Sequence, residues 1–390
     1  MIPALLPTYA RNELTFEKGE GAYLFATNGR KYLDFASGIA VTALGHAHPH
    51  LVAALTQQAQ KLWHCSNLFQ IAGQQRLGER LVEATFADSV FFANSGAEAM
   101  ELTLKIARKY QHEAGHPERY RVIACSGSFH GRTLATLAAA GNEKYLKGFE
   151  PTVEGFDHVA FGNLNEMRAA VTKQTAAILV EPVQGEGGVR PPPKGYLKGL
   201  REIADEFGLL LLFDEVQCGM GRTGKLFAHE WEGVTPDVMA IAKGLGGGFP
   251  VGACLATEKA AACMTAGSHG STFGGNPLAM AVGNAVLDVM LEKDFLPHVD
   301  RVARLLKAEL DKLVAKYPKV FAEARGAGLL LGLRCVATNN EIMDALRQEG
   351  LLTVSAGDNV LRLLPPLILT EAQVAEAIGI IDRVAGNWKA

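Results

Sequence analysis

The feature that most constrains the fold is an unbroken apolar run, Gly208-Leu-Leu-Leu-Leu-Phe213, followed directly by Asp214. Because polar and apolar residues do not alternate in it, the run predicts a strand buried on both faces of a parallel sheet. Further apolar strand patterns lie near Val90, Val122, Ala177, Met239 and Ala253. Helical patterns alternate with these strands from about His50 to Asn276. The alternation predicts an α/β fold, a mostly parallel sheet with helices on both faces.

The chain length and the pattern at both ends predict three segments. Residues 1–49 are expected to form an N-terminal arm, part of a small domain, with a hairpin over 20–34 that turns at Asn28-Gly29. Residues 50–276 are expected to form the large domain. Residues 277–390 are expected to form a smaller α+β C-terminal domain that begins with a long linking helix running to about Val314.

Two residues with useful chemistry end predicted strands. Asp214 closes the apolar run, and Lys243 stands between the run 237–242 and a glycine-rich turn at 244–248. The carboxyl ends of parallel strands line the ligand crevice of an open α/β sheet, so both side chains are expected to face one pocket. A partly desolvated lysine is a usable amine nucleophile. Pyridoxal phosphate needs this pair, a lysine for its aldehyde and a carboxylate for its ring nitrogen. Considered alone, Asp214 or Lys243 could also be an ordinary polar residue at the end of a strand, with no role in a site.

A strand, turn and helix pattern suggests a site for phosphate. Ser89–Ala93 predicts a strand, residues 94–97 a turn, and Glu98–Lys109 a helix. Free backbone N–H groups at the helix start, the helix dipole and the Ser95 hydroxyl suit an anion. Simple N-capping of the helix is an equally good explanation of this motif alone. Phe129 could stack on a planar cofactor or belong to the core.

Seven motifs in order resemble the signature of class III pyridoxal-phosphate aminotransferases, from about Thr8 to the C-terminal region. They are residues 94–99 (Asn-Ser-Gly-Ala-Glu-Ala), 129–133 (Phe-His-Gly-Arg-Thr), 181–188 (Glu-Pro-Val-Gln-Gly-Glu-Gly-Gly), 213–217 (Phe-Asp-Glu-Val-Gln), 242–247 (Ala-Lys-Gly-Leu-Gly-Gly), 270–277 (Gly-Ser-Thr-Phe-Gly-Gly-Asn-Pro) and 362–366 (Arg-Leu-Leu-Pro-Pro). The resemblance implies a fold-type-I pyridoxal-phosphate transferase that acts as a homodimer with a shared active site.

The resemblance also implies a role for each motif residue. Lys243 would carry the cofactor and shuttle a proton, and Asp214 would pair with the ring nitrogen. The remaining cofactor-binding residues would be Phe129 and Val216 on the ring, Gln217 near its phenolic oxygen, Ser95, Gly96 and Ala97 at the phosphate, and Thr272 with Ser271 from the neighbouring subunit. The family often has Thr at position 97, so one hydroxyl contact is expected to be replaced by a backbone contact.

Substrate binding is expected to depend on two arginines, because guanidinium groups bind carboxylates in bidentate fashion. By resemblance, Arg132 would hold the donor's carboxylate and the distal carboxylate of glutamate. Arg362 would hold the α-carboxylate of glutamate, and Glu186 would pair with Arg362 while the donor is bound. The implied reaction moves the terminal amino group of N-acetylornithine to 2-oxoglutarate. Ornithine, succinylornithine, 4-aminobutyrate and acylated lysine-pathway intermediates remain alternative donors, and surface salt bridges remain an alternative for the arginines.

Two other chemistries have weaker support. Gly219-Met-Gly-Arg-Thr-Gly224 matches a dinucleotide-binding pattern, which would indicate an NAD-dependent oxidoreductase. The segment 225–233 is too short and irregular for the helix that such a site requires, so a flexible loop at the pocket mouth is the preferred interpretation. His46, His48 and His50 have a spacing that metal ligands use, but no carboxylate or cysteine cluster accompanies them, and no metal site is predicted.

Bulk properties fit a metabolic enzyme. A formal net charge of −3 over 390 residues argues against nucleic acid as a partner. The start of the chain lacks a basic segment before a long apolar one, and no apolar run approaches the length of a membrane span. The six cysteines show no paired spacing and are expected to be reduced thiols. The expected location is the cytoplasm.

Overall fold

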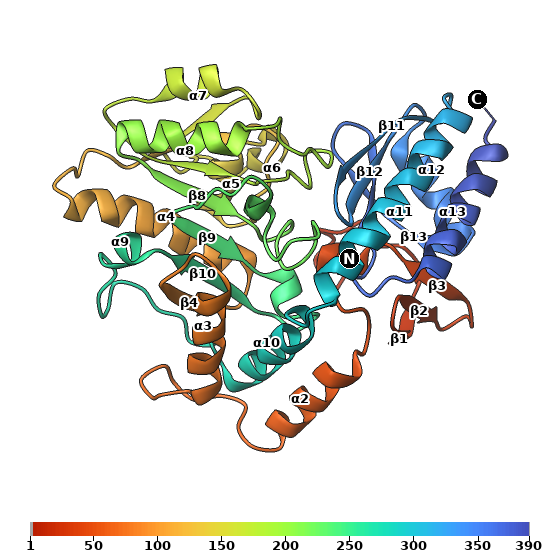
Figure 1. Ribbon diagram of the computed structural model, residues 1–390, viewed down its shortest axis with the longest axis horizontal. Helices are drawn as coiled ribbons and strands as arrows, with labels where there is room; N and C mark the ends of the chain where they lie inside the picture. Colours follow the sequence, from red (N-terminus) through yellow and green to blue (C-terminus); the bar gives the residue numbers. More distant parts are fainter. Residues whose placement is uncertain (1–2, 390) are drawn as a thin grey trace.

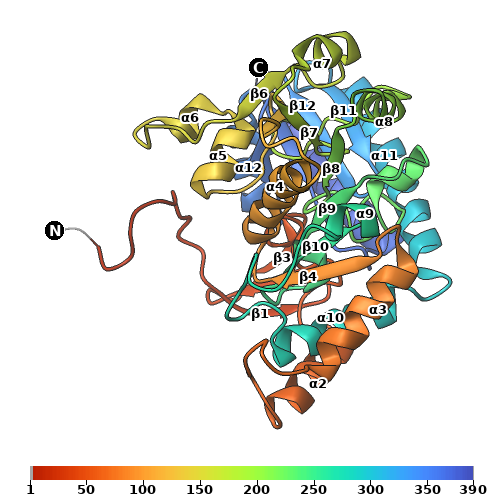
Figure 2. The ribbon, with the colours of Figure 1, turned by 90° about the vertical axis from the view of Figure 1, so that its left-hand side faces the viewer.

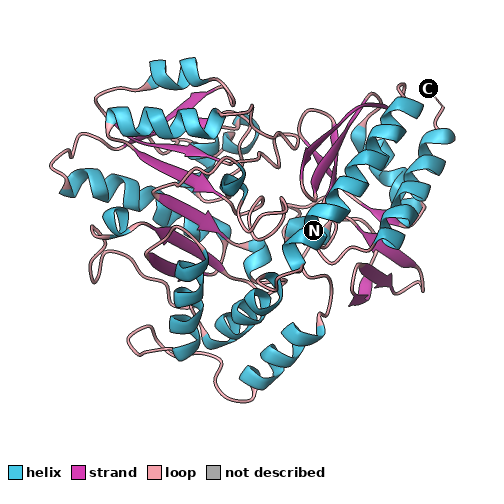
Figure 3. Ribbon diagram, viewed as in Figure 1, coloured by secondary structure: helices cyan, strands magenta, loops and turns pink. Residues whose placement is uncertain are grey.

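The computed structural model describes residues 3–389. Met1 and Ile2 of the predicted N-terminal arm and Ala390 of the predicted C-terminal domain lie outside the described residues. The chain forms two lobes that stand side by side in Figures 1 and 3. The larger lobe is built on a seven-stranded sheet and the smaller lobe on two four-stranded sheets.

The large sheet has the strand order β4-β10-β9-β8-β7-β5-β6. Its strands are β4 (Ser89–Ala93), β5 (Arg121–Cys125), β6 (Phe156–Val159), β7 (Thr175–Val180), β8 (Leu210–Asp214), β9 (Val238–Ile241) and β10 (Gly252–Ala256). Strands β5 to β9 pair in parallel, and β10 runs antiparallel to β9 and β4. The predicted α/β fold with a mostly parallel sheet is confirmed. Strand β6 is missing from the sequence pattern because Asp157 and His158 interrupt its apolar residues.

Helices cover both faces of this sheet, as predicted. One face packs against α4 (Gly96–Glu113), α5 (Leu134–Ala140) and α9 (Glu258–Ala261). The other packs against α7 (Leu164–Ala170) and α8 (Tyr196–Phe207), with α3 (Ala72–Ala84) beside β4. Figure 2 shows α4 and α8 on either side of β7 and β8. Along β8, Leu210 and Leu212 point to the first face and Leu211 and Phe213 to the second, which explains the unbroken apolar run.

The smaller lobe combines the two ends of the chain. One antiparallel sheet has the order β11 (Phe321–Ala327), β12 (Leu330–Cys335), β15 (Val360–Leu363) and β14 (Val354–Ala356). The other joins β1 (Phe16–Glu20), β2 (Tyr23–Ala26) and β3 (Lys31–Asp34) to β13 (Leu351–Leu352). The predicted hairpin at Asn28-Gly29 is confirmed by the β2–β3 pairing. The predicted domain boundaries at residues 49 and 276 stay predictions.

The single long helix predicted from Pro277 to about Val314 is wrong. The chain forms α10 (Pro277–Met290) and α11 (Phe295–Lys316), separated by residues 291–294. Pro297 explains the break, because a proline ring fits the first turn of a helix but clashes with the carbonyl four residues earlier in its interior. Helix α10 packs against α2 (Pro49–Ala59) and α3, whereas α11 packs against β11 and α13 (Glu371–Gly386).

The remaining helical segments are short, apart from α12 (Asn339–Gln348) in the smaller lobe. They are α1 (Ser37–Ala40), α6 (Glu143–Leu146) and the 3₁₀ turns η1 (Ala228–Trp231) and η2 (Lys243–Leu245). Over residues 3–389, no helix combines the length and apolarity that crossing a membrane requires.

Candidate active site

A cavity of about 420 Å³ lies where the central strands of the large sheet end. Lys243 follows β9, Asp214 ends β8, and the start of α4 closes a further side. Nine of the predicted site residues line it together: Ser95, Gly96, Ala97, Phe129, Arg132, Asp214, Val216, Gln217 and Lys243. This agrees with the rule that ligands bind beyond the carboxyl ends of parallel strands.

Lys243 occupies a constrained position. Its backbone φ is +46°, a left-handed conformation that residues other than glycine rarely adopt. Burial lowers the pKa of its ammonium group, and the nearby Arg362 guanidinium lowers it further, whereas Glu186, Asp214 and Glu181 oppose the shift. Since the shift favours the neutral amine, Lys243 is suited to act as a nucleophile or as a proton acceptor in the cavity.

The Asp214 carboxylate is buried, with only 3% of the residue exposed. The Val216 N–H donates to Oδ1 at 3.0 Å, and His130 Nδ1 lies 2.7 Å from Oδ2. His130 is also buried, and its Nε2 has no hydrogen-bond partner among residues 3–389. The contacts hold Asp214 in one orientation at the wall of the cavity, where it can receive a positively charged group.

Glu181 is a second buried carboxylate at the cavity. It accepts the Phe129 N–H at 3.1 Å. Burial raises the pKa of Glu181 well above its ordinary range, and the neighbouring Asp214 charge adds to this effect. Neither Glu181 nor His130 was among the predicted site residues. Glu181 could have been found by the rule that identified Asp214, because it directly follows the buried strand β7.

The start of α4 offers an anion site. Ser95 is the N-cap, and its Oγ accepts the Glu98 N–H at 3.2 Å. A Cβ atom at Gly96 would lie 2.7 Å from Val216 Cγ1, so only glycine lets the helix start come this close to the Val216 side chain. Helix N-termini attract anions through free N–H groups and the helix dipole. With Lys243 and Asp214, the cavity could hold a molecule that carries an aldehyde, a basic ring nitrogen and a phosphate.

The two predicted substrate arginines have different environments. Arg132 is exposed at the cavity, and its guanidinium stacks over the Tyr145 ring at 3.8 Å from the centroid. Arg362, on β15, is buried, and its Nη1 lies 2.7 Å from Glu186 Oε1 and 2.8 Å from Gln217 Oε1. Since Gln217 lines the cavity, it connects the cavity to the Glu186–Arg362 ion pair.

Ser271 and Thr272 do not line this cavity. Ser271 Oγ accepts a hydrogen bond from Asn94 Nδ2 at 3.2 Å, beside the start of α4, and Thr272 is exposed. A role for Thr272 at a phosphate therefore requires the cavity of a second copy of the chain, and it stays a prediction.

The glycine-rich segment 219–224 is not a loop at the pocket mouth, and that expectation is wrong. It is buried: a Cβ atom at Gly221 would lie 2.9 Å from the Leu367 side chain. The short η1 that follows agrees with the argument against a dinucleotide site. Gly219 and Gly221 allow this packing, because neighbouring atoms come closer to them than a Cβ atom would permit.

Two of the three histidines of the candidate metal motif contact separate carboxylates, and His48 Nδ1 has no hydrogen-bond partner among residues 3–389. His46 Nε2 lies 2.8 Å from Asp34 Oδ2, and His50 Nε2 lies 2.8 Å from Asp288 Oδ2. Within the described part of the chain, no group of three or more histidine, cysteine, aspartate or glutamate side chains could hold a metal ion. All six cysteines are free thiols.

Comparisons with known proteins identify the family. Residues 8–385 match the family described as aminotransferase class-III. An acetylornithine aminotransferase of Mesorhizobium japonicum is 63% identical over 378 residues, 97% of this chain and 95% of that protein. The N-acetylornithine aminotransferase structure of Stenotrophomonas maltophilia has a TM-score of 0.85 and 39% identity and covers 97% of each chain. The ornithine aminotransferase of Toxoplasma gondii has a TM-score of 0.94 and 32% identity, covering 98% of this chain and 92% of that chain. The fold implied by the resemblance is confirmed, and the chain belongs to the class III aminotransferase family.

Proposed function

We propose that this protein transfers the terminal amino group of N-acetylornithine to 2-oxoglutarate, with pyridoxal phosphate as its cofactor. The products are N-acetylglutamate 5-semialdehyde and glutamate, a step of arginine biosynthesis. The observation that carries the proposal is that Lys243, Asp214 and the start of α4 line one cavity. The relative that is 63% identical supports N-acetylornithine as the donor.

The residues around the cavity fit pyridoxal phosphate. Lys243 would bond to its aldehyde, Asp214 would face its ring nitrogen, and Ser95, Gly96 and Ala97 would hold its phosphate. Phe129 and Val216 would contact the ring, and Gln217 would lie near its phenolic oxygen. When bound, the cofactor supplies an electron sink for the carbon that loses a proton. Lys243 Nζ would also carry the proton to and from the substrate carbon.

The arginines would select the two substrates by their carboxylates. Arg132 would bind the donor carboxylate and, in the second half of the reaction, the distal carboxylate of 2-oxoglutarate. Arg362 would bind the α-carboxylate of 2-oxoglutarate after Glu186 has moved away. The 2.7 Å contact between Arg362 Nη1 and Glu186 Oε1 supports this exchange, because it neutralises Arg362 when no second carboxylate is bound.

We also propose that the enzyme is a cytoplasmic homodimer with a shared site, in which Thr272 and Ser271 of one subunit reach the phosphate in the other. The exposure of Thr272, outside the cavity of its own chain, supports this arrangement.

The proposal is tested by measuring each half of the reaction separately. The reconstituted protein is incubated with N-acetylornithine, ornithine, succinylornithine or 4-aminobutyrate, and then with 2-oxoglutarate, and glutamate is quantified. The expected result is stoichiometric glutamate formation that is fastest after N-acetylornithine. Faster transfer from unacetylated ornithine would replace the proposed donor, and no transfer from any donor would contradict the function.

A further inference from the structure

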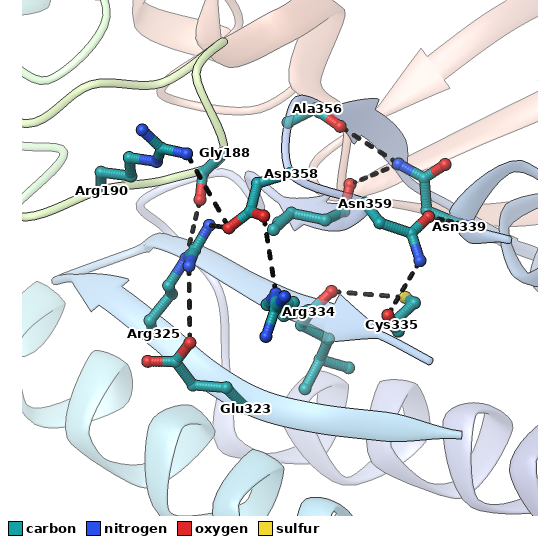
Figure 4. A network of polar contacts seen from close by, with 12 residues as sticks. Gly188, Arg190, Glu323, Arg325, Arg334, Cys335, Asn339, Ala356, Asp358 and Asn359 are labelled. Carbon is teal, nitrogen blue, oxygen red and sulfur yellow. Dashed lines mark hydrogen bonds and ion pairs between the residues drawn. The ribbon is translucent and has the colours of Figure 1, made fainter. Parts of the chain in front are cut away.

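The loop that carries Glu186 is held by the smaller lobe from outside the cavity. The Gly357 N–H donates to the Glu186 carbonyl at 2.8 Å, and Arg325 Nε donates to the Gly188 carbonyl at 2.8 Å. Figure 4 shows Arg325 and Asp358 of the smaller lobe against Gly188 and Arg190 of this loop. The loop backbone is therefore fixed at two carbonyl groups, one of which belongs to Glu186 itself.

Asp358 is the centre of the ionic part of this contact. Its Oδ2 lies 2.7 Å from Arg325 Nη2 and 3.9 Å from Arg190 Nη2, and its Oδ1 lies 3.6 Å from Arg334 Nε. The hydrogen bond from Arg325 is the main reason that the pKa of Asp358 is lowered, and it further favours the charged carboxylate. Asp358 thus orients Arg325 toward Gly188 and attracts Arg190 at the end of the loop.

The turn that carries Asp358 is itself firmly held. Asp358 and Asn359 have φ values of +56° and +54°. Asn359 Nδ2 donates to the carbonyls of Cys335 and Ala337, each at 2.8 Å, and Asn359 Oδ1 accepts the Asn339 N–H at 2.9 Å. These hydrogen bonds offset the cost of two successive left-handed residues. The loop that carries Glu186 is consequently bound to a turn whose own conformation is held by hydrogen bonds.

The same hairpin carries Arg362. Strands β14 and β15 flank the turn 357–359, and Arg362 lies on β15, three residues after Asn359. The backbone of Glu186 is bound to the turn of this hairpin, while its carboxylate is bound to an arginine on the strand. One rigid element therefore determines the position of both members of the Glu186–Arg362 ion pair.

We infer that Asp358 and Arg325 are positioning residues that hold Glu186 on Arg362 and thereby set the preference of the enzyme between its amino donor and its 2-oxo acid acceptor. The inference rests on the proposed function. Neither residue lines the cavity. With the loop fixed, Glu186 is preorganised on Arg362, so the acceptor's α-carboxylate must displace a well-placed partner. A loosened loop makes this displacement easier and leaves Arg362 less well neutralised while the donor is bound.

The test compares Asp358→Asn and Arg325→Met with the wild-type protein. Each half-reaction has its own kcat/KM in a two-step transfer of this kind. Both variants are expected to raise the ratio of kcat/KM for 2-oxoglutarate to kcat/KM for the donor by about 5-fold, the size of effect typical of a partly exposed ion pair. The matched control is Asp382→Asn, which removes the Lys316 ion pair of the same lobe far from the loop and should leave the ratio unchanged.

Two further measurements separate positioning from general damage. In a Glu186→Gln background, Asp358→Asn should no longer change the ratio, because the carboxylate that it positions is gone. Hydrogen exchange at Gly357 and at residues 185–190 should become faster in Asp358→Asn, without a change in the sheet of the larger lobe.

The possible outcomes are distinct. An unchanged ratio in an active Asp358→Asn protein would overturn the inference alone, as would an equal change with and without Glu186. A common decrease of both constants together with a lower melting temperature would also overturn it, by indicating a purely structural role. No transfer by the wild-type protein with any donor would overturn the proposed function, and with it the inferred preference.

Discussion

Lys243 is placed by features on both sides of it in the sequence. The preceding strand β9 is completely buried, and the following Gly244 lies against the Met220 side chain, where a Cβ atom would come within 2.8 Å of Met220 Cβ. The contacts of β9 and Gly244 therefore fix the position of the Lys243 backbone at the edge of the sheet. Its left-handed backbone and the lowered pKa of its amine are the kind of local strain and charge perturbation that cluster at active sites.

Replacing Lys243 by alanine should abolish transamination. Because the variant lacks both the nucleophile and the proton-transfer group, turnover should fall by roughly 10³-fold or more. Steady-state transfer from N-acetylornithine to 2-oxoglutarate measures this. Lys225→Ala, which removes an exposed lysine near Trp231, serves as the control and should retain activity. Comparable activity in the two variants would contradict the role of Lys243.

Glu215, next to Asp214, should make stability depend on pH. It accepts the N–H groups of Ala228 and His229, and burial raises its pKa from 4.5 to about 8. Between these two values the folded state keeps a proton that the unfolded state has released. Stability from this group therefore falls as pH rises through this window, by at most about 1.4 kcal/mol per pH unit, and is constant above it.

Glu215→Gln mimics the protonated carboxyl and should remove this slope. Melting temperatures of the variant and of wild type are compared at a series of pH values within the window. The exposed Glu206→Gln, which breaks an ion pair with Arg168, is the control and should keep the wild-type slope. Identical slopes for wild type and Glu215→Gln would show that Glu215 does not bind the proton.

Asp214 and Lys243, which end strands, were predicted, whereas Glu181, which also follows a strand, and His130, which depends on a tertiary contact, were missed. Asp214 and Lys243 follow apolar runs, so the geometry of parallel sheets was enough to bring them together. His130 follows no strand, and its contact with Asp214 joins residues 84 positions apart in the sequence. The Glu186–Arg362 ion pair was expected only by family resemblance, because its members belong to different lobes.

At the scale of elements, the start of α4 has a structural and a ligand-binding role that can be separated. Ser95→Ala removes the N-cap hydrogen bond to Glu98 and should cost about 1 kcal/mol of stability. It should also weaken pyridoxal phosphate binding, measured by fluorescence titration. Thr370→Ala removes the equivalent cap of α13, where the Gln373 N–H donates to Thr370 Oγ1, far from the cavity. Equal cofactor affinity in both variants would leave Ser95 with only the capping role.

Helices and strands with a clear pattern of apolar residues were predicted well, whereas breaks and turns that depart from such a pattern were not. The buried strands of the large sheet and the β2–β3 hairpin follow directly from apolar runs and from Asn-Gly turn chemistry. The helix predicted after Pro277 extended across residues 291–294, where Leu-Glu-Lys suits a helix. Pro297 was the signal in the sequence for the break, and α10 and α11 have different packing partners. The turn 219–224 was expected at the surface because glycine content does not reveal which neighbouring atoms come close.

At the scale of the whole molecule, the N-terminal arm is joined to the C-terminal part of the smaller lobe, and the two lobes to each other, by contacts that no local pattern indicates. Strand β13 has only two residues, and its parallel pairing with β3 joins Leu351 to Leu33. A strand of two residues is too short to show an alternating pattern of apolar residues. The N-terminal arm was therefore predicted to belong to the small domain, but β13 was not predicted as the strand that pairs with it. The long-range contacts of the turn 357–359 with the Glu186 loop were likewise invisible in the sequence.

The proposed dimer makes a prediction about Thr272. Thr272→Ala should weaken cofactor retention if Thr272 reaches the phosphate of the neighbouring subunit, because one hydroxyl hydrogen bond is lost, typically about 1 kcal/mol or about 5-fold in affinity. Dialysis followed by quantification of bound pyridoxal phosphate measures this. Thr265→Ala, which removes an exposed threonine earlier in the chain than Ser271 and Thr272, is the control. Unchanged retention in a dimeric Thr272→Ala protein would argue against the shared site.

The most direct test of the proposed function is to identify the residue that holds the cofactor. The protein is reconstituted with pyridoxal phosphate, its visible absorption is recorded, the bond is made permanent by borohydride reduction, and the modified peptide is located by mass spectrometry. The proposed function predicts a visible band before reduction, which the amino donor bleaches and 2-oxoglutarate restores, and a single modified residue, Lys243. Modification of another lysine, or no band at all after reconstitution, would contradict it.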